Sequence, residues 1–258
     1  MAPPEFWIAV AGVVGLIVGS YLNVVIHRLP EGISTVTPAS RCPACGARIR
    51  WYDNLPVVSW LALRGRCRDC GAPISPRYPV VELATGLAFA GAVALFGVRA
   101  DAFVAMVLAG LLIALAGIDL DHFLLPDRLT LPGIGLGLAS QLAVEHGSLA
   151  RGIAGALVGA GLLLVVAGAW ELARGSEGMG LGDVKMIAMI GAFLGIGGVL
   201  VSLVVGTLLG SVVGLLAIAR GRGTLAAKLP FGVFLALGGL AALFAGPRIV
   251  ALYLGAAR

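Results

Sequence analysis

The feature that most constrains this chain is a series of long apolar runs. Apolar residues make up 59% of the 258 residues, and charged residues make up only 12%. A soluble domain carries about 25% charged residues, whereas a helix needs about 20 mainly apolar residues to cross a bilayer. The runs lie at residues 6–26, 79–97, 102–118, 129–144, 153–172, 183–194, 199–219 and 229–244. The sequence therefore predicts an all-α polytopic membrane protein with about eight transmembrane helices.

A glycine-rich break at residues 195–198 separates the sixth run from the seventh. The sixth run, at residues 183–194, is too short to cross a hydrocarbon core of about 30 Å unaided. We expect it to form a partial span beside a cavity or to continue further along the chain. The chain contains 39 glycines, which favours close packing of helices within a bilayer.

A polar insertion at residues 27–78 interrupts the apolar pattern and carries eight arginines and all four cysteines. We therefore expect a first transmembrane helix at residues 1–26, a small module at 27–78 and a seven-helix membrane domain at 79–258. If the module is cytoplasmic and the N-terminus periplasmic, fourteen of the eighteen basic residues lie inside. The four outside are Arg99, Arg151, Arg248 and Arg258. This bias predicts that orientation in an inner membrane. The basic residues then report orientation, and we expect membrane lipid and not nucleic acid as a partner.

The four cysteines form two closely spaced pairs, Cys42 with Cys45 and Cys67 with Cys70, each followed directly by a glycine. Two such turns supply the tetrahedral set of four thiolates that Zn²⁺ prefers, with no coordination position left open for chemistry. The alternatives are a pair of redox dithiols, a disulfide or unliganded thiols, and a cytoplasmic location opposes stable disulfides. We expect a structural zinc ion.

Two of the thirteen acidic residues lie at the ends of apolar runs, Asp119 after the third run and Asp183 at the start of the sixth. Ionisable groups at membrane depth are costly and are candidates for function. In the predicted orientation both carboxylates lie at the cytoplasmic ends of their helices. Two neighbouring carboxylates can share a proton and activate one water, as in aspartyl proteases. Either aspartate can be the acid or the base on this evidence.

Other interpretations of these residues remain open at this point. Asp121 and Asp127 compete with Asp119, and His122 is either a metal ligand or a solvated polar residue. The two aspartates can instead cap helices or pair with Lys185 and Arg128. They can also form a proton or ion relay, although a relay distributes ionisable groups along the membrane depth. A non-enzymatic assembly factor that docks other proteins through the cysteine module is a third possibility.

Several segments taken together resemble the bacterial type IV prepilin peptidases, the bifunctional prepilin leader peptidase/N-methyltransferase group of GxGD aspartyl proteases. The similar segments are residues 19–30, both cysteine pairs, 52–60, 74–82, 119–127, 180–183 and 230–232. The resemblance covers nearly the whole chain in the family's order. It implies that Asp119 and Asp183 are the two catalytic aspartates.

The resemblance also implies a substrate and a second reaction. Substrates would be type IV prepilins and type II secretion pseudopilins, whose basic leader is cut after a glycine on the cytoplasmic side. The new N-terminal residue would then be methylated with S-adenosylmethionine, although a peptidase without methylation is the alternative. The chain shows no glycine fingerprint of a Rossmann-type cofactor fold. Glu82, Asn23 and Asp53 are candidates for methyl transfer by polarity and position only.

Overall fold

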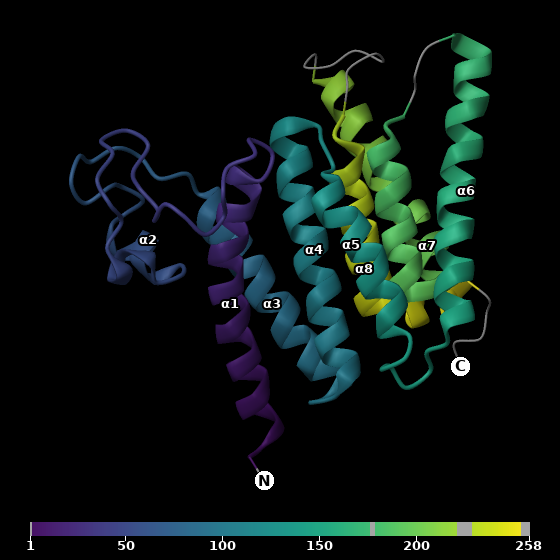
Figure 1. Cartoon of the computed structure of the whole chain (residues 1–258), viewed down its shortest axis with the longest axis horizontal. Helices are drawn as coiled ribbons and strands as arrows, with labels where there is room; N and C mark the ends of the chain where they lie inside the picture. The colour runs from purple at the N-terminus through teal and green to yellow at the C-terminus, as the bar shows by residue number, and fades with distance from the viewer. Residues whose placement is uncertain (1, 176–178, 221–228, 254–258) are drawn as a thin grey trace. The chain divides into compact units, whose positions relative to one another are not determined.

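The computed structural model describes residues 2–175, 179–220 and 229–253 (Figure 1). The helices, including one 3₁₀ turn (η1), are α1 (Pro4–Arg28), η1 (Trp51–Asn54), α2 (Val58–Ala62), α3 (Arg77–Phe96), α4 (Ala100–His122), α5 (Asp127–Ser140), α6 (Leu149–Arg174), α7 (Leu181–Ala219) and α8 (Phe231–Tyr253). Within the described residues there is no strand, and only two isolated β-bridges occur. The predicted all-α fold with a cysteine module between the first two long helices is confirmed. Arg222, Lys228 and Arg258, which entered the predicted charge bias, lie outside the described residues.

Five helices are long and apolar enough to cross a membrane by length and composition, namely α1, α3, α4, α6 and α7. A shorter apolar segment, Phe231–Gly246 of α8, and the 14-residue helix α5 accompany them. At 39 residues, α7 has the length of two spans of about 20 residues. The chain is therefore a multi-pass membrane protein.

The sixth and seventh predicted spans are both parts of α7, which is interrupted at Gly195. This residue has φ 71° and ψ −171°, a backbone conformation that essentially only glycine adopts. Arg151 on α6 packs against the interruption, and its Nη2 donates a hydrogen bond to the Leu194 carbonyl oxygen at 3.1 Å. Of the predicted glycine-rich break, only Gly195 has a non-helical backbone. Arg151 from the neighbouring helix supplies a hydrogen-bond donor to the carbonyl group next to it.

The chain divides into two compact units, Met1–Ala114 and Leu115–Arg258. In the first unit α1 packs along α3, and a Cβ at Gly19 would lie 2.7 Å from the Glu82 Cα, so the two backbones touch closely. In the second unit α7 packs against α5, α6 and α8 (Figure 1). The division falls within α4, so both Asp119 and Asp183 belong to the second unit.

Candidate active site and metal centre

Asp119 lies in the last turn of α4, and only 5% of its surface is exposed. The helix is apolar from Ala102 to Ile118, so its C-terminal end brings this carboxyl group into the interior of the unit. Asp119 Oδ2 accepts a hydrogen bond from the Val233 backbone N–H at 3.2 Å. Val233 is in the first turn of α8, where backbone N–H groups lack partners within the helix. The carboxyl group of Asp119 therefore caps a helix that begins more than a hundred residues later.

Asp183 is the third residue of α7 and is half-buried. Its backbone N–H donates to the Gly180 carbonyl oxygen at 3.1 Å, which forms the turn that starts the helix. The Asp183 carboxyl group lies close enough to Asp119 for the charge on Asp119 to act on it. The structure therefore brings together the end of α4 and the start of α7, the two helix ends that the sequence singled out.

One apolar side chain, Leu125, lines this site beside both aspartates. It is buried, and it lies in the short connection between α4 and α5. A Cβ at Gly182 would come within 2.9 Å of the Leu125 Cβ, and a Cβ at Gly232 within 3.0 Å of the Leu125 Cδ2. Glycines at both positions therefore let α7 and α8 approach Leu125. Leu125 lies within the family-like segment 119–127, and Val233 directly follows the segment 230–232, but the sequence indicated no role for either residue.

The residues that competed with Asp119 lie elsewhere. Asp121 and His122 are exposed. Asp127, also exposed, accepts a hydrogen bond from Lys185 Nζ at 2.6 Å. Lys185 is thus paired with Asp127. The structure therefore does not support the alternative in which Lys185 pairs with Asp119 or Asp183.

The four cysteines of the first unit converge on one point. Their Sγ atoms all lie within 4.8 Å of one another. The two turns have the same hydrogen bonds: Gly46 N–H donates to the Cys42 carbonyl oxygen at 2.8 Å, and Gly71 N–H to the Cys67 carbonyl oxygen at 2.9 Å. Both glycines have φ of 72°, in the left-handed region that glycine adopts without strain. The matched sequence doublets therefore fold into matched turns.

This geometry fits a metal ion bound by four thiolates. Four sulfur atoms at about 2.3 Å from a zinc ion in a tetrahedron are about 3.8 Å apart, and the Sγ atoms of Cys42 and Cys70 are 3.9 Å apart. All four thiols are free, and that separation is nearly twice the S–S bond length of about 2.05 Å. The backbone N–H groups of Cys45 first and Ala44 second lower the pKa of Cys42 to about 7, whereas burial raises the pKa of Cys45 and that of Cys70, the latter to about 12. Metal binding to all four would therefore release protons. The cluster can therefore hold a metal ion.

Each of the three residues named as candidates for methyl transfer has a partner within the first unit. Asn23 Nδ2 donates to the Tyr78 carbonyl oxygen at 3.1 Å. Buried Glu82 accepts from the Val57 N–H at 2.7 Å, at the start of α2. Asp53 accepts two-pronged hydrogen bonds from Arg68, as close as 2.6 Å. These contacts join parts of the module to one another and to α1 and α3. None of them indicates which residue takes part in methyl transfer.

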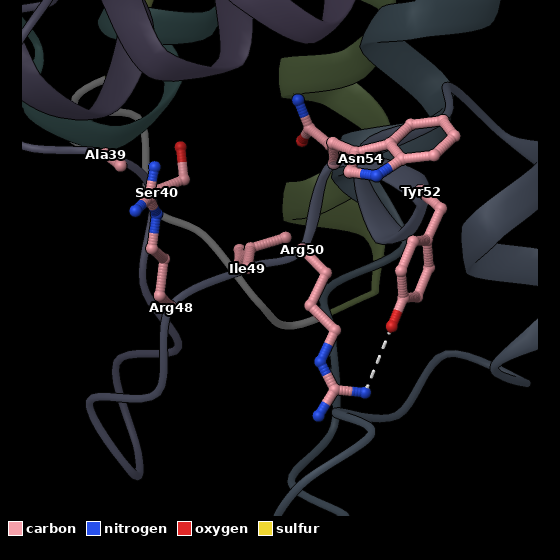
Figure 2. A pocket seen from close by; sticks show the side chains of 8 residues that line it. Ala39, Ser40, Arg48, Ile49, Arg50, Tyr52 and Asn54 are labelled. Carbon is pink, nitrogen blue, oxygen red and sulfur yellow. Dashed lines mark hydrogen bonds between the residues drawn. The ribbon is translucent and has the colours of Figure 1, made fainter.

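A hollow of about 560 Å³ lies on the surface of the cysteine module (Figure 2). Its lining residues are Ala39, Ser40, Arg48, Ile49, Arg50, Trp51, Tyr52 and Asn54. Arg50 Nη1 donates to the Tyr52 hydroxyl at 3.2 Å, shown as the dashed line in Figure 2. The hollow is basic and aromatic, and sequence reasoning did not predict it.

The fold and the site together define a multi-pass helical membrane protein with two neighbouring carboxyl groups at helix ends and a separate four-cysteine module. The chain belongs to the type IV leader peptidase family. The model of that family matches residues 106–215, which include both aspartates, and the bacterial peptidase A24 N-terminal domain matches residues 13–96, which include all four cysteines.

Curated relatives extend the match along the whole chain. A prepilin leader peptidase/N-methyltransferase from Burkholderia pseudomallei (strain K96243) is 41% identical over 95% of this chain and 87% of that protein. Proteins of the same name from Stutzerimonas stutzeri and Pseudomonas putida are 39% and 38% identical. The alignment with the first covers 100% of both chains, and that with the second covers 96% of this chain and 94% of the relative. No solved structure matches the chain.

Proposed function

We propose that this protein is a membrane aspartyl endopeptidase that removes the basic leader, after its final glycine, from type IV prepilins and type II secretion pseudopilins. The relatives' shared name, prepilin leader peptidase/N-methyltransferase, supports this substrate class. The observation that carries the proposal is the meeting of Asp119, from the end of α4, with Asp183, from the start of α7, within electrostatic reach in one unit. Those two residues are the proposed catalytic pair.

The pair would act through one water molecule. Neighbouring carboxyl groups do not both ionise readily, so one keeps a proton near neutral pH while the other is ionised. The ionised carboxylate takes a proton from the water as the water oxygen attacks the peptide carbonyl carbon. The protonated carboxyl group donates a hydrogen bond to the carbonyl oxygen, and the leaving amine receives a proton as the C–N bond breaks.

The proposed location is the bacterial inner membrane, with the N-terminus periplasmic and the cysteine module cytoplasmic. The distribution of the basic residues supports this orientation, because cytoplasmic segments carry an excess of lysine and arginine. The orientation puts the ends of α4 and α7 that carry the aspartates on the cytoplasmic side. There a substrate presents its basic leader before export of its mature part. Membrane lipid is then the partner of the exposed apolar helices, and nucleic acid is not a partner.

We also propose a structural zinc ion on Cys42, Cys45, Cys67 and Cys70, whose sulfur positions suit it. A second activity, N-methylation of the new N-terminal residue with S-adenosylmethionine, is supported by the relatives' name. S-adenosylmethionine would supply a methyl group on a sulfonium cation. The hollow of Figure 2 does not fit that group, since Arg48 and Arg50 line it and their positive charges oppose a cation. No residue is therefore assigned to methyl transfer.

Co-expression with a prepilin whose basic leader ends in glycine tests the peptidase. Asp119→Asn and Asp183→Asn should each leave the leader attached while the protein stays in the membrane at the parent level. Asp121→Asn is the matched control, because Asp121 is exposed two residues from Asp119, and it should process normally. Leader removal in both Asn variants would contradict the proposal. Mass spectrometry of the cleaved pilin tests the second activity, and an amine that is never methylated would remove it.

A further inference from the structure

We propose that the first turn of α8, through Gly232 and the Val233 N–H, positions Asp119 as the general base and thereby leaves Asp183 as the general acid. This inference rests on the proposed peptidase function. It names which carboxyl group takes the proton of the water and which one donates to the peptide. Gly232 and Val233 are positioning residues, since they act on the substrate only through Asp119.

The first step is the hydrogen bond between Asp119 and α8. Val233 N–H donates to Asp119 Oδ2 at 3.2 Å and also lies 3.3 Å from the Pro230 carbonyl oxygen. Such shared donors are common at helix termini. A hydrogen bond from a backbone N–H to a carboxyl group favours its ionised form over the carboxylic acid.

The second step is the contrast with Asp183. In the described part of the chain, the structure shows no hydrogen bond to the Asp183 carboxyl group, and the charge that acts on it is that of Asp119. A carboxyl group beside an ionised neighbour, with no donor of its own, keeps the proton that the pair shares. The negative charge therefore belongs on Asp119 and the proton on Asp183.

This division of roles balances the chemistry. Asp119 takes one proton from the water, whose oxygen bonds to the peptide carbonyl carbon. Asp183 gives its proton to the developing oxyanion, and the proton held by Asp119 goes to the leaving amine as the C–N bond breaks. Asp183 recovers its proton as the carbonyl re-forms, so the pair ends as it began and no other reactant is needed.

The third step is the requirement for glycine at position 232. A Cβ there would lie 2.8 Å from Asp119 Oδ2, 3.1 Å from Asp119 Cγ and 3.0 Å from Leu125 Cδ2. Carbon atoms do not occupy such positions, so any side chain at 232 must move the Asp119 carboxyl group or the start of α8. Alanine at this position therefore weakens the hydrogen bond from the Val233 N–H that holds Asp119 ionised, without removing either aspartate.

The test compares Gly232→Ala with Gly135→Ala in the full-length protein, by steady-state cleavage of a prepilin across pH. Gly135 is exposed on α5 in the same unit, and a Cβ there meets nothing within 4 Å. Gly232→Ala should lower kcat about 10- to 100-fold, the effect of a small misplacement of a catalytic group, with KM within about twofold because the substrate-binding surface is unchanged. The acidic limb of its kcat–pH profile should move to higher pH, since the base ionises less readily. Gly135→Ala should match the parent in all three.

A loss of folding alone lowers kcat equally at every pH, so the position of the acidic limb separates the two explanations. Val233→Pro is the second variant. It removes the donated N–H within the first helical turn, where proline is tolerated, and should move the same limb in the same direction. Parent-like profiles in both variants, or lower rates with an unmoved limb, would overturn the assignment of roles. Neither result would contradict the peptidase itself, which fails only if Asp119→Asn and Asp183→Asn still process the prepilin.

Discussion

Lys185 Nζ lies 2.6 Å from Asp127 Oδ1, which joins the second turn of α7 to the first residue of α5. Lys185 follows Asp183 by two residues, yet its charge is directed to a different acid. The cation nearest to Asp183 in the sequence is thereby paired with Asp127. Asp119 is then the charged group that acts on Asp183. Two carboxyl groups that share one proton need such an arrangement.

We predict that Asp127→Asn leaves leader cleavage within about threefold of the parent. The ion pair is partly exposed, with 32% of the Lys185 side chain and 55% of the Asp127 side chain accessible, and such pairs contribute at most about 1 kcal/mol. Asp183→Asn, made in parallel, should abolish cleavage. Rates measured on a purified prepilin check both. Equal losses in the two variants would mean that Asp127 belongs to the chemistry.

For the cysteine module we predict about one zinc ion per chain, bound by the four thiolates. Cys42→Ser and Cys67→Ser, one from each turn, should each lower the zinc content and the amount of protein in the membrane. Methylation should fall before cleavage does, because the module lies in the other unit from the aspartates. Elemental analysis of the purified protein makes the measurement. Folded, fully active protein without any of the four thiols would contradict this role.

At Gly195 the backbone conformation itself predicts a cost of substitution. Gly195→Ala places a Cβ 2.9 Å from Arg151 Cγ in a region of φ that side chains avoid, and strain there costs about 1–3 kcal/mol. Gly197→Ala is the matched control, since it lies two residues away on α7 and its Cβ meets nothing within 4 Å. Thermal unfolding in detergent should show a lower Tm for the first variant only. Similar Tm values for the two would argue against the interruption of α7.

Asp53 and Arg68 predict a pH dependence within the module. Hydrogen bonds from Arg68 hold the pKa of Asp53 below its ordinary value. The pair therefore stabilises the fold above the unfolded pKa of about 3.9, and this contribution is lost as the pH falls through the lower folded pKa. Arg68→Gln should be less stable than the parent at neutral pH, and the gap should close below about pH 4. If the difference in stability between Arg68→Gln and the parent stays constant down to the lowest pH, the Asp53–Arg68 pair is not its cause.

Hydropathy and motif spacing predicted much of this molecule. The apolar runs located the long helices to within a few residues, and the break before the seventh run identified the interruption at Gly195. Both features are local, since a lipid-facing helix must be apolar along its own length. The cysteine doublets predicted a converging cluster because each turn is encoded by its own short segment.

Contacts between distant helices could not be predicted in the same way. Nothing near Asp119 in the sequence indicates that Val233 donates to it, and nothing near Lys185 indicates that it pairs with Asp127, 58 residues earlier. Such choices depend on how α4, α5, α7 and α8 pack, and packing is decided by shape over the whole unit. The basic and aromatic hollow around Trp51 arises for the same reason, from loop folding that local patterns do not encode.

The central claim is that the carboxyl groups of Asp119 and Asp183 act on a single water. The most direct measurement is their separation in an experimental structure with a prepilin bound. We predict that the nearest oxygens lie no more than about 5.6 Å apart, which is twice an O–H···O hydrogen bond of about 2.8 Å, with the scissile carbonyl beside both. Carboxyl groups held more than about 10 Å apart, with the substrate bound for cleavage, would contradict the account.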